Sequence, residues 1–173
     1  SVTTRTAGFN TADLDKMTDS GKMGMVLLMV IGGSPGSTAG GMKTTTAAVL
    51  FAMAISVFRK NEQAHLYNRR IAEETQRNAA TIFVLYMMLF TGSAMVISYV
   101  EKVPLVTAFF ETGSAIGTVG LSLGLTPTLG LASRLVLICL MFFGRVGGLT
   151  LIFATVSGKR TEYKYPQEKI TVG

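Results

Sequence analysis

The feature that most restricts how this chain folds is a long stretch without one charged residue, AATIFVLYMMLFTGSAMVISYV, from Ala79 to Val100. A helix of about 20 apolar residues crosses the roughly 30 Å hydrocarbon core of a bilayer. The whole chain shares this character, with 49% hydrophobic and only 15% charged residues. Because soluble domains carry roughly a quarter charged residues, the sequence predicts an all-α integral membrane protein.

Two further segments are long enough to span. Leu129–Val156 is apolar apart from Arg134 and Arg145. Lys22–Phe58 is also long enough, but its middle is the glycine-rich stretch GGSPGSTAGGMK. Proline and glycine oppose continuous helix, so this segment is expected to form two half-helices, about Ser20–Ile31 and Lys43–Phe58.

A shorter apolar segment, Pro104–Gly117, cannot cross a bilayer. Its proline is suited to the first helical position, so we expect a helix that enters the membrane and turns back. Within it Glu111 is expected to brace the following turn through hydrogen bonds rather than to bind an ion.

Basic residues gather beside the apolar segments, in the polar connector Arg59–Arg77 and in the tail from residue 157. Basic loops favour the cytoplasmic side, so both are predicted to be cytoplasmic, and the connector is predicted to be helical, either on the membrane surface or in solvent. The net charge of +6 therefore indicates a bilayer and not nucleic acid as the partner. The expected divisions are 1–58, 59–78, 79–156 and 157–173.

The glycine-rich stretch resembles a nucleotide-binding loop, in which a lysine directly follows the second glycine. Here Met42 separates Gly41 from Lys43, and a long apolar run precedes the loop. ATP binding is therefore disfavoured. His65 and Cys139 stand apart from other catalytic or ligating residues, so no enzymatic activity and no covalently bound cofactor are predicted.

An internal repeat organises the chain, because its two ends match at an offset of 112 positions. TAGF at Thr6–Phe9 aligns with TVGL at Thr118–Leu121, and SGKMGMVLLMVIGG at Ser20–Gly33 aligns without a gap with ASRLVLICLMFFGR at 132–145. Each unit is predicted to contain a spanning helix, a re-entrant helix, a T-x-G hairpin and a second span. The second unit in this chain, 79–156, is complete, whereas the first lacks everything before its hairpin.

Extended T-x-G backbone at membrane depth has a physical use. Non-helical backbone survives there only when it is buried in protein or lines water. Carbonyl oxygens turned toward a common axis replace the hydration shell of a potassium ion, and glycine allows close approach. The two triplets are therefore candidates for a filter.

At these residues the chain resembles the Trk/Ktr superfamily of potassium uptake proteins, and most of all the C-terminal half of the Ktr-type membrane subunit. The resemblance is carried by TTRTAGFNT, GGSPGSTAGGMKTTT, ETGSAIGTVGLSLGLTP, FGRVGGLTL and YKYPQEKITVG. It implies a potassium-channel-like pore of four units, of which this chain contains the partial third and the complete fourth, so that the N-terminal half of the pore lies outside it. It also implies that two such subunits form a homodimer, regulated by a cytoplasmic nucleotide-binding ring. It also implies K⁺ uptake stimulated by Na⁺, in the cell membrane.

The resemblance also implies a single filter glycine in each unit. The residues expected to bind K⁺, through main-chain carbonyls only, are Thr4, Arg5, Thr6, Ala7, Gly8, Gly117, Thr118, Val119 and Gly120. The loop below it is predicted to be a gate. Arg145 takes the register of Gly33, and a cation at that depth needs polar partners, which loop carbonyls and hydroxyls would supply. The predicted gate residues are Gly33, Pro35, Gly36, Ser37, Thr38, Gly40, Gly41, Lys43 and Arg145.

Two other functions stay open at this point. A non-conducting membrane scaffold would use the same glycines for helix packing, as Gly144, Gly147 and Gly148 are expected to do. A proton-coupled Trk-type potassium transporter would share the pore and differ in its driving ion.

Overall fold

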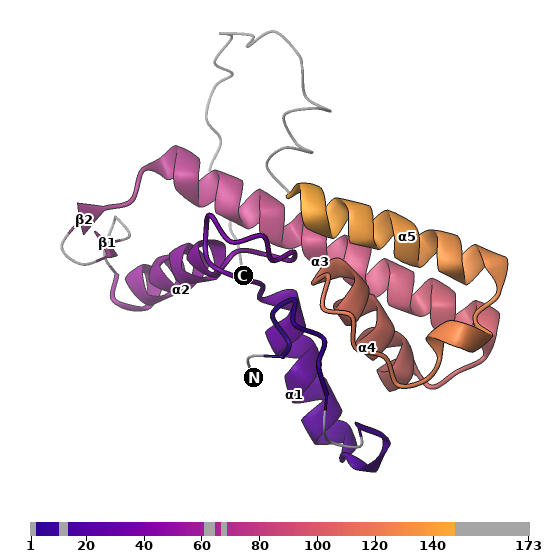
Figure 1. The fold of residues 1–173 in the computed structure, drawn as a ribbon. Helices are drawn as coiled ribbons and strands as arrows, with labels where there is room; N and C mark the ends of the chain where they lie inside the picture. The colour runs from indigo at the N-terminus through magenta and orange to yellow at the C-terminus, as the bar shows by residue number, and fades with distance from the viewer. Residues whose placement is uncertain (1–2, 11–13, 61–64, 67–68, 148–173) are drawn as a thin grey trace, which may run out of the picture.

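The computed structural model describes residues 3–10, 14–60, 65–66 and 69–147. The regular secondary structure of the described part is almost entirely helical (Figure 1). In chain order the elements are the 3₁₀ turn η1 (Leu14–Lys16), α1 (Asp19–Val30), α2 (Thr44–Phe58), β1 (His65–Leu66), β2 (Arg69–Arg70), α3 (Glu73–Glu101), α4 (Leu105–Ile116), the 3₁₀ turn η2 (Thr126–Thr128) and α5 (Leu131–Val146).

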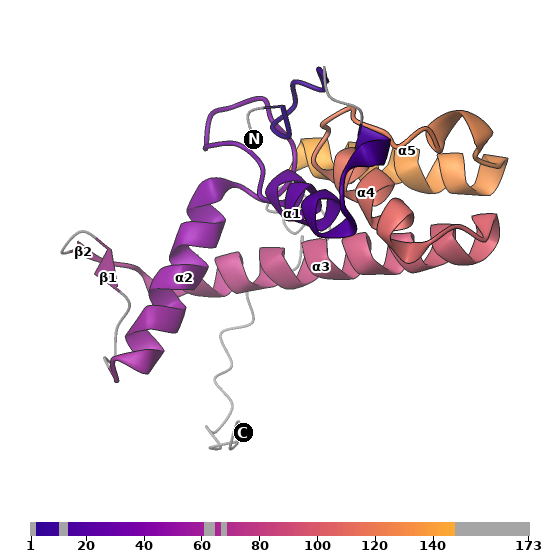
Figure 2. The same ribbon diagram turned by 90° about the horizontal axis from the view of Figure 1, so that it is seen from below.

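Helix α3 is the longest helix, and α2, α4 and α5 pack against it, whereas α1 packs on α4; Figure 2 shows this arrangement from below. Helix α3 contains the predicted span and begins earlier, at Glu73, where two glutamates in the first turn suit the positive end of the helix dipole. It is the one described helix that is long and apolar enough to cross a membrane. It stops at Lys102, which adopts the left-handed conformation just before Pro104.

Helix α4 lies at the centre of the fold and contacts α1, α3 and α5. Every residue from Phe110 to Ile116 is buried, including the polar Glu111 and Thr112. Pro104 is the N-cap and not the first helical residue, one position from its predicted place. The core around α4 combines its own side chains with Met29 of α1, Ile97 of α3 and Leu140 of α5.

The predicted break in the second segment is confirmed, since α1 ends at Val30 and α2 begins at Thr44. The two helices run in different directions (Figures 1 and 2). Their facing ends are nevertheless tied, because Ile31 and Met42 form a parallel bridge and Thr44 N donates to Gly33 O at 3.2 Å. The intervening loop therefore leaves and re-enters the helices at nearly one point.

The predicted helix over the connector is wrong for its first part. Arg59 ends α2, Lys60 has a φ of 53°, and β1 and β2 pair antiparallel before α3 starts at Glu73. A short polar segment gains little from helix formation when no apolar face packs on a neighbour, because helix nucleation is unfavourable.

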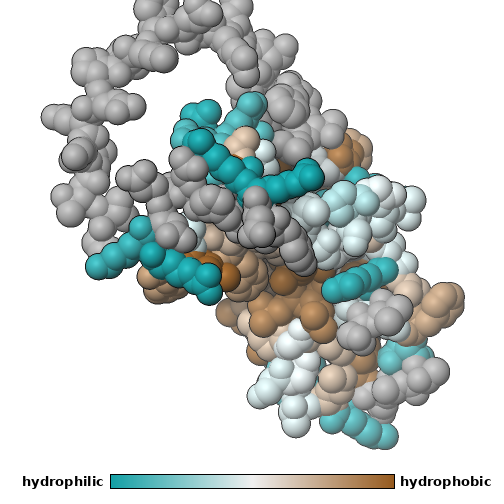
Figure 3. Space-filling model, turned by 90° about the vertical axis from the view of Figure 1, so that its left-hand side faces the viewer, coloured by the Kyte–Doolittle hydropathy of each residue, from teal (hydrophilic) through white to brown (hydrophobic). Residues whose placement is uncertain are grey.

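Large apolar side chains cover the outer faces of the bundle. On α3 they include Met88, Met95 and Tyr99, on α5 Ile138 and Phe142, and on α2 Phe51 and Phe58. Figure 3 shows such apolar surface across the middle of one side, with hydrophilic residues toward the edges. Contiguous exposed apolar surface of this kind is rare in soluble monomers and is typical of a face that meets lipid or protein.

Candidate functional site

The two T-x-G triplets share an unusual backbone conformation. Thr6 and Gly8 have φ of 66° and 65°, and Thr118 and Gly120 have φ of 50° and 87°. A β-branched threonine at positive φ is a conformational outlier, of the kind held in place by its surroundings at functional sites. The repeat therefore extends from sequence to main-chain geometry.

The two triplets also lie against each other, although they are far apart in sequence. A Cβ placed on Gly8 would lie 2.7 Å from the carbonyl oxygen of Val119, which leaves room only for hydrogen. A Cβ on Gly120 would lie 4.0 Å from Gly8 Cα. Positive φ favours glycine at both positions, and at Gly8 the close approach of the Val119 carbonyl excludes a side chain as well.

The second triplet is held over the C-terminal end of α4. The preceding amide and the first two amides of the triplet donate to carbonyls of the last helical turn. These bonds are Gly117 N to Gly113 O at 2.9 Å, Thr118 N to Ala115 O at 3.0 Å and Val119 N to Ser114 O at 2.8 Å. The first triplet is closed by its own flanks, since Gly8 N donates to Thr3 O and Thr3 Oγ1 donates to Phe9 O.

The nine residues predicted to bind the ion differ in exposure. Thr4, Gly117 and Val119 are buried, Arg5, Ala7 and Gly120 are exposed, and the other three are intermediate. The Thr6 hydroxyl oxygen is buried and has no hydrogen-bond partner among the described residues.

The glycine-rich loop touches the second triplet directly. Gly40 N donates to the Thr118 hydroxyl oxygen at 3.1 Å, and a Cβ on Gly40 would collide with that threonine at 2.6 Å. Gly41 N donates to Gly144 O of α5 at 3.2 Å. Gly33, Gly40 and Gly41 are buried, whereas Pro35, Gly36, Ser37 and Thr38 are exposed.

The predicted contact between Arg145 and the loop is present, with Arg145 Nη1 donating to Thr38 O. Lys43 Nζ donates to Ser37 O at 3.1 Å and to Ala39 O at 2.6 Å. Both cations thus bind main-chain carbonyls of one loop. A helix precedes this loop where a phosphate-binding loop has a strand, and the ammonium group is already engaged, so the geometry speaks against ATP.

Two close contacts were not anticipated from the sequence. A Cβ on Gly144 would lie 2.0 Å from Ile116 O, so α5 crosses the end of α4 at backbone distance. The contact between Gly40 and Thr118 is the second. Glycine itself was the available signal for both, since the sequence predicted close packing at Gly144 without its partner. Gly147 faces open space and Gly148 lies outside the described residues.

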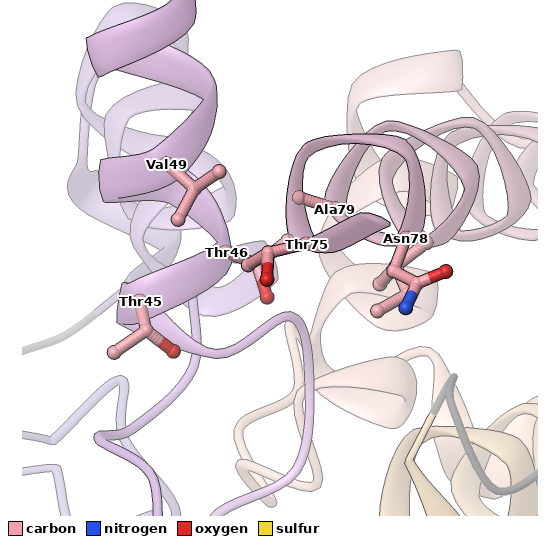
Figure 4. Close-up of a pocket in the computed structure, with 7 residues that line it drawn as sticks. Thr45, Thr46, Val49, Thr75, Asn78 and Ala79 are labelled. Carbon is pink, nitrogen blue, oxygen red and sulfur yellow. The ribbon is translucent and has the colours of Figure 1, made fainter. Parts of the chain in front are cut away.

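A cavity of about 260 Å³ lies between α2 and α3 (Figure 4). Threonine hydroxyls from both helices, the Asn78 amide and apolar side chains line it, and none of the lining residues belongs to the predicted site. It has no charged lining residue and stands apart from the triplets.

Comparison with known proteins gives one consistent result. The family model described as TrkH, cation transport protein, matches residues 1–163. The potassium/sodium uptake protein NtpJ of Enterococcus hirae is 42% identical over 180 residues, covering 100% of this chain and 40% of the relative. The Ktr system potassium uptake proteins B of Bacillus subtilis and Vibrio alginolyticus are each 34% identical, covering 99% and 100% of this chain and 39% and 38% of the relatives. The chain spans about two fifths of the length of these curated relatives, which are named as transport proteins and not as enzymes.

Proposed function

Because the chain belongs to the TrkH family of cation transport proteins, we propose that it forms the C-terminal half of a potassium-conducting pore in the cell membrane. The observation that carries the proposal is the paired left-handed backbone of Thr6–Gly8 and Thr118–Gly120, with Gly8 against Val119. Carbonyl oxygens of such segments replace the water around K⁺ without side-chain chemistry.

In this proposal α4 is a re-entrant pore helix. Its length suits a helix that enters the membrane without crossing it, and its C-terminal end adjoins the Thr118–Gly120 turn. The negative end of the helix dipole favours a cation there.

The loop from Gly32 to Lys43 is the gate of the proposed pore. Its support is its contact with Thr118 above and its attachment to α5 through Gly144 and Arg145. The loop carries no regular helix that would make it rigid, and two cationic side chains hold its carbonyls. Moving it away requires breaking only a few hydrogen bonds, each worth about 1 kcal/mol.

The remaining parts of the proposal come from the resemblance to the Trk/Ktr superfamily. We propose that the N-terminal half of the pore precedes this segment, that two copies pair as a homodimer, and that a cytoplasmic nucleotide-binding ring regulates them. The transported ion is K⁺, with Na⁺ as activator. The protein crosses the membrane several times, with the connector and the tail cytoplasmic.

The test replaces Gly120 by serine in the complete transporter reconstituted in liposomes. Gly120→Ser is expected to change the ratio of K⁺ to Na⁺ flux by about tenfold, since a side chain at positive φ costs about 1–2 kcal/mol and reshapes the turn. Gly124→Ser is the matched control, because Gly124 has a φ of 78°, faces open space and lies outside the triplet.

An unchanged ratio in Gly120→Ser would remove the filter assignment. A properly assembled wild-type protein without K⁺ flux would leave the non-conducting scaffold as the function.

A further inference from the structure

Glu111 is a buried carboxylate in the middle of α4, with 3% of its surface exposed. Its three hydrogen-bond partners among the described residues lie in the loop that follows Gly120. Its Oε1 accepts from Ser122 Oγ at 2.5 Å and from Leu123 N at 3.0 Å, and its Oε2 accepts from Thr126 Oγ1 at 2.8 Å. Both carboxylate oxygens are therefore occupied by donors of one short segment.

These contacts attach the chain that follows the second triplet to α4, the same helix that holds the chain at the start of the triplet. On its inner side the triplet is tied to α4 by the amides of Gly117, Thr118 and Val119. On its outer side the chain returns to α4 at Glu111, more than one helical turn before the helix ends. Both ends of the turn are thus attached to the same rigid helix.

Side-chain packing holds only part of the turn, since Val119 and the following Leu121 are buried in the core whereas Gly120 is exposed. A cavity of about 310 Å³ lies between the turn and α5, lined by Glu111, Thr118, Gly120, Leu137 and Met141 among others. On this side, where no side chain fills the space, the position of Gly120 depends more on hydrogen bonds. Those of a carboxylate are roughly twice as strong as neutral ones.

Glu101 offers a comparison within the same chain. It also accepts from a serine hydroxyl and a backbone amide, Ser133 Oγ at 2.6 Å and Gly130 N at 2.9 Å. Its partners lie at the start of α5, away from the triplets. The two carboxylates therefore accept the same kinds of hydrogen bond, but only Glu111 contacts the loop that follows the triplet.

We propose that Glu111 is a positioning residue that determines ion selectivity, by holding the outer end of the Thr118–Gly120 turn at the spacing that K⁺ requires. This rests on the proposed function, because it assumes that the turn binds the ion. The carboxylate acts through Ser122 and Thr126 and does not touch the ion itself.

The experiment measures K⁺ and Na⁺ flux in liposomes with the complete transporter, together with its thermal unfolding. Glu111→Ala removes all three contacts and is expected to lower the K⁺ to Na⁺ flux ratio about tenfold. Thr126→Val keeps the shape of the side chain almost constant and removes one of the three contacts to Glu111, together with the 3.0 Å hydrogen bond to Ser122 Oγ, with an expected decrease of about threefold. Glu111→Gln keeps the shape of the side chain and is expected to restore part of the ratio lost in the alanine variant.

Glu101→Ala is the matched control, expected to lower thermal stability and to leave the flux ratio unchanged. The proposal is overturned if Glu111→Ala retains the wild-type ratio, or if Glu101→Ala lowers it equally. Should Glu111→Ala not fold, Thr126→Val and Glu111→Gln decide by the same ratio. The proposed function would instead be overturned if the wild-type protein conducted K⁺ without selectivity over Na⁺ and if Gly120→Ser left its flux unchanged.

Discussion

The two repeat-related helices α1 and α5 differ at equivalent positions, because one ends there and the other continues. Gly32 and Gly144 occupy the same register, yet α1 has already ended at Val30 while α5 continues through Gly144 to Val146. The residues that follow differ, with Gly33, Ser34 and Pro35 on one side and Arg145 and Val146 on the other. Local helix-breaking residues, and not the apolar repeat, therefore decide where the span breaks.

The continuous helix supports the broken one. Gly144 offers its carbonyl to Gly41, and Arg145 donates to Thr38 O. A loop of this composition has few apolar side chains to pack, so its position depends on partners from elsewhere. At this register the first unit has Gly33, which belongs to the loop, and the second unit has Arg145, which binds the loop at Thr38 O.

Burial also differs between equivalent positions. Met29 is fully buried whereas Met141 is 46% exposed, and Leu28 is 37% exposed whereas Leu140 is 2% exposed. The same residue type in the same register thus meets different neighbours, because α1 packs on the α4 of the following unit.

The largest expected effect sharpens the comparison at its shared glycine. Gly144→Ala and Gly32→Ala each place a Cβ about 2 Å from a backbone carbonyl oxygen, of Ile116 and Gly40 respectively. Because backbone cannot yield as a side chain does, each is expected to lower the free energy of unfolding by about 3 kcal/mol or more, measured by thermal unfolding in detergent. Gly24→Ala and Gly92→Ala, which face open space inside α1 and α3, are expected to be neutral or stabilising by up to about 1 kcal/mol. Equal tolerance of all four would contradict the close approach.

The second prediction concerns the loop between α1 and α2, which has no counterpart in α5. Deletion of Gly36–Gly41 is expected to raise K⁺ flux through the complete transporter about tenfold, since the barrier beneath the proposed filter is lost. The bridge between Ile31 and Met42 already holds the loop ends together, so the helices need not move. Flux is compared at equal amounts of assembled protein. Wild-type flux in an assembled deletion variant would exclude a gating role for the loop.

The smallest effect tests the residue that replaces Gly33 in the second unit. Arg145→Gln is expected to raise flux about threefold, because the loop loses a charge-assisted contact to Thr38 O. Arg134→Gln is the control from the same helix, since Arg134 donates instead to Pro127 O outside the loop. If both variants conducted alike, Arg145 would be a structural anchor and not part of a barrier.

Prediction from sequence succeeded where the cause is local or follows from the repeat. Pro35 and its neighbouring glycines place the ends of α1 and α2 within one residue, and the register of Arg145 indicated its contact with the loop. Prediction failed at residues 65–66 and 69–70, where two short paired strands stand in place of the expected helix. No apolar period was present there to separate the two structures.

The sequence by itself determined the apolar helices, the break between α1 and α2, and the repeated T-x-G triplets, because these depend on the distribution of hydrophobic residues and on the backbone limits of proline and glycine. Only the tertiary structure decided that Gly8 meets Val119, that Gly40 meets Thr118, and that Glu111 binds the loop after Gly120. Such contacts join residues far apart in the chain and exist only once α1, α4 and α5 have packed together. Their geometry is set by how closely whole helices approach, which no short stretch of sequence encodes.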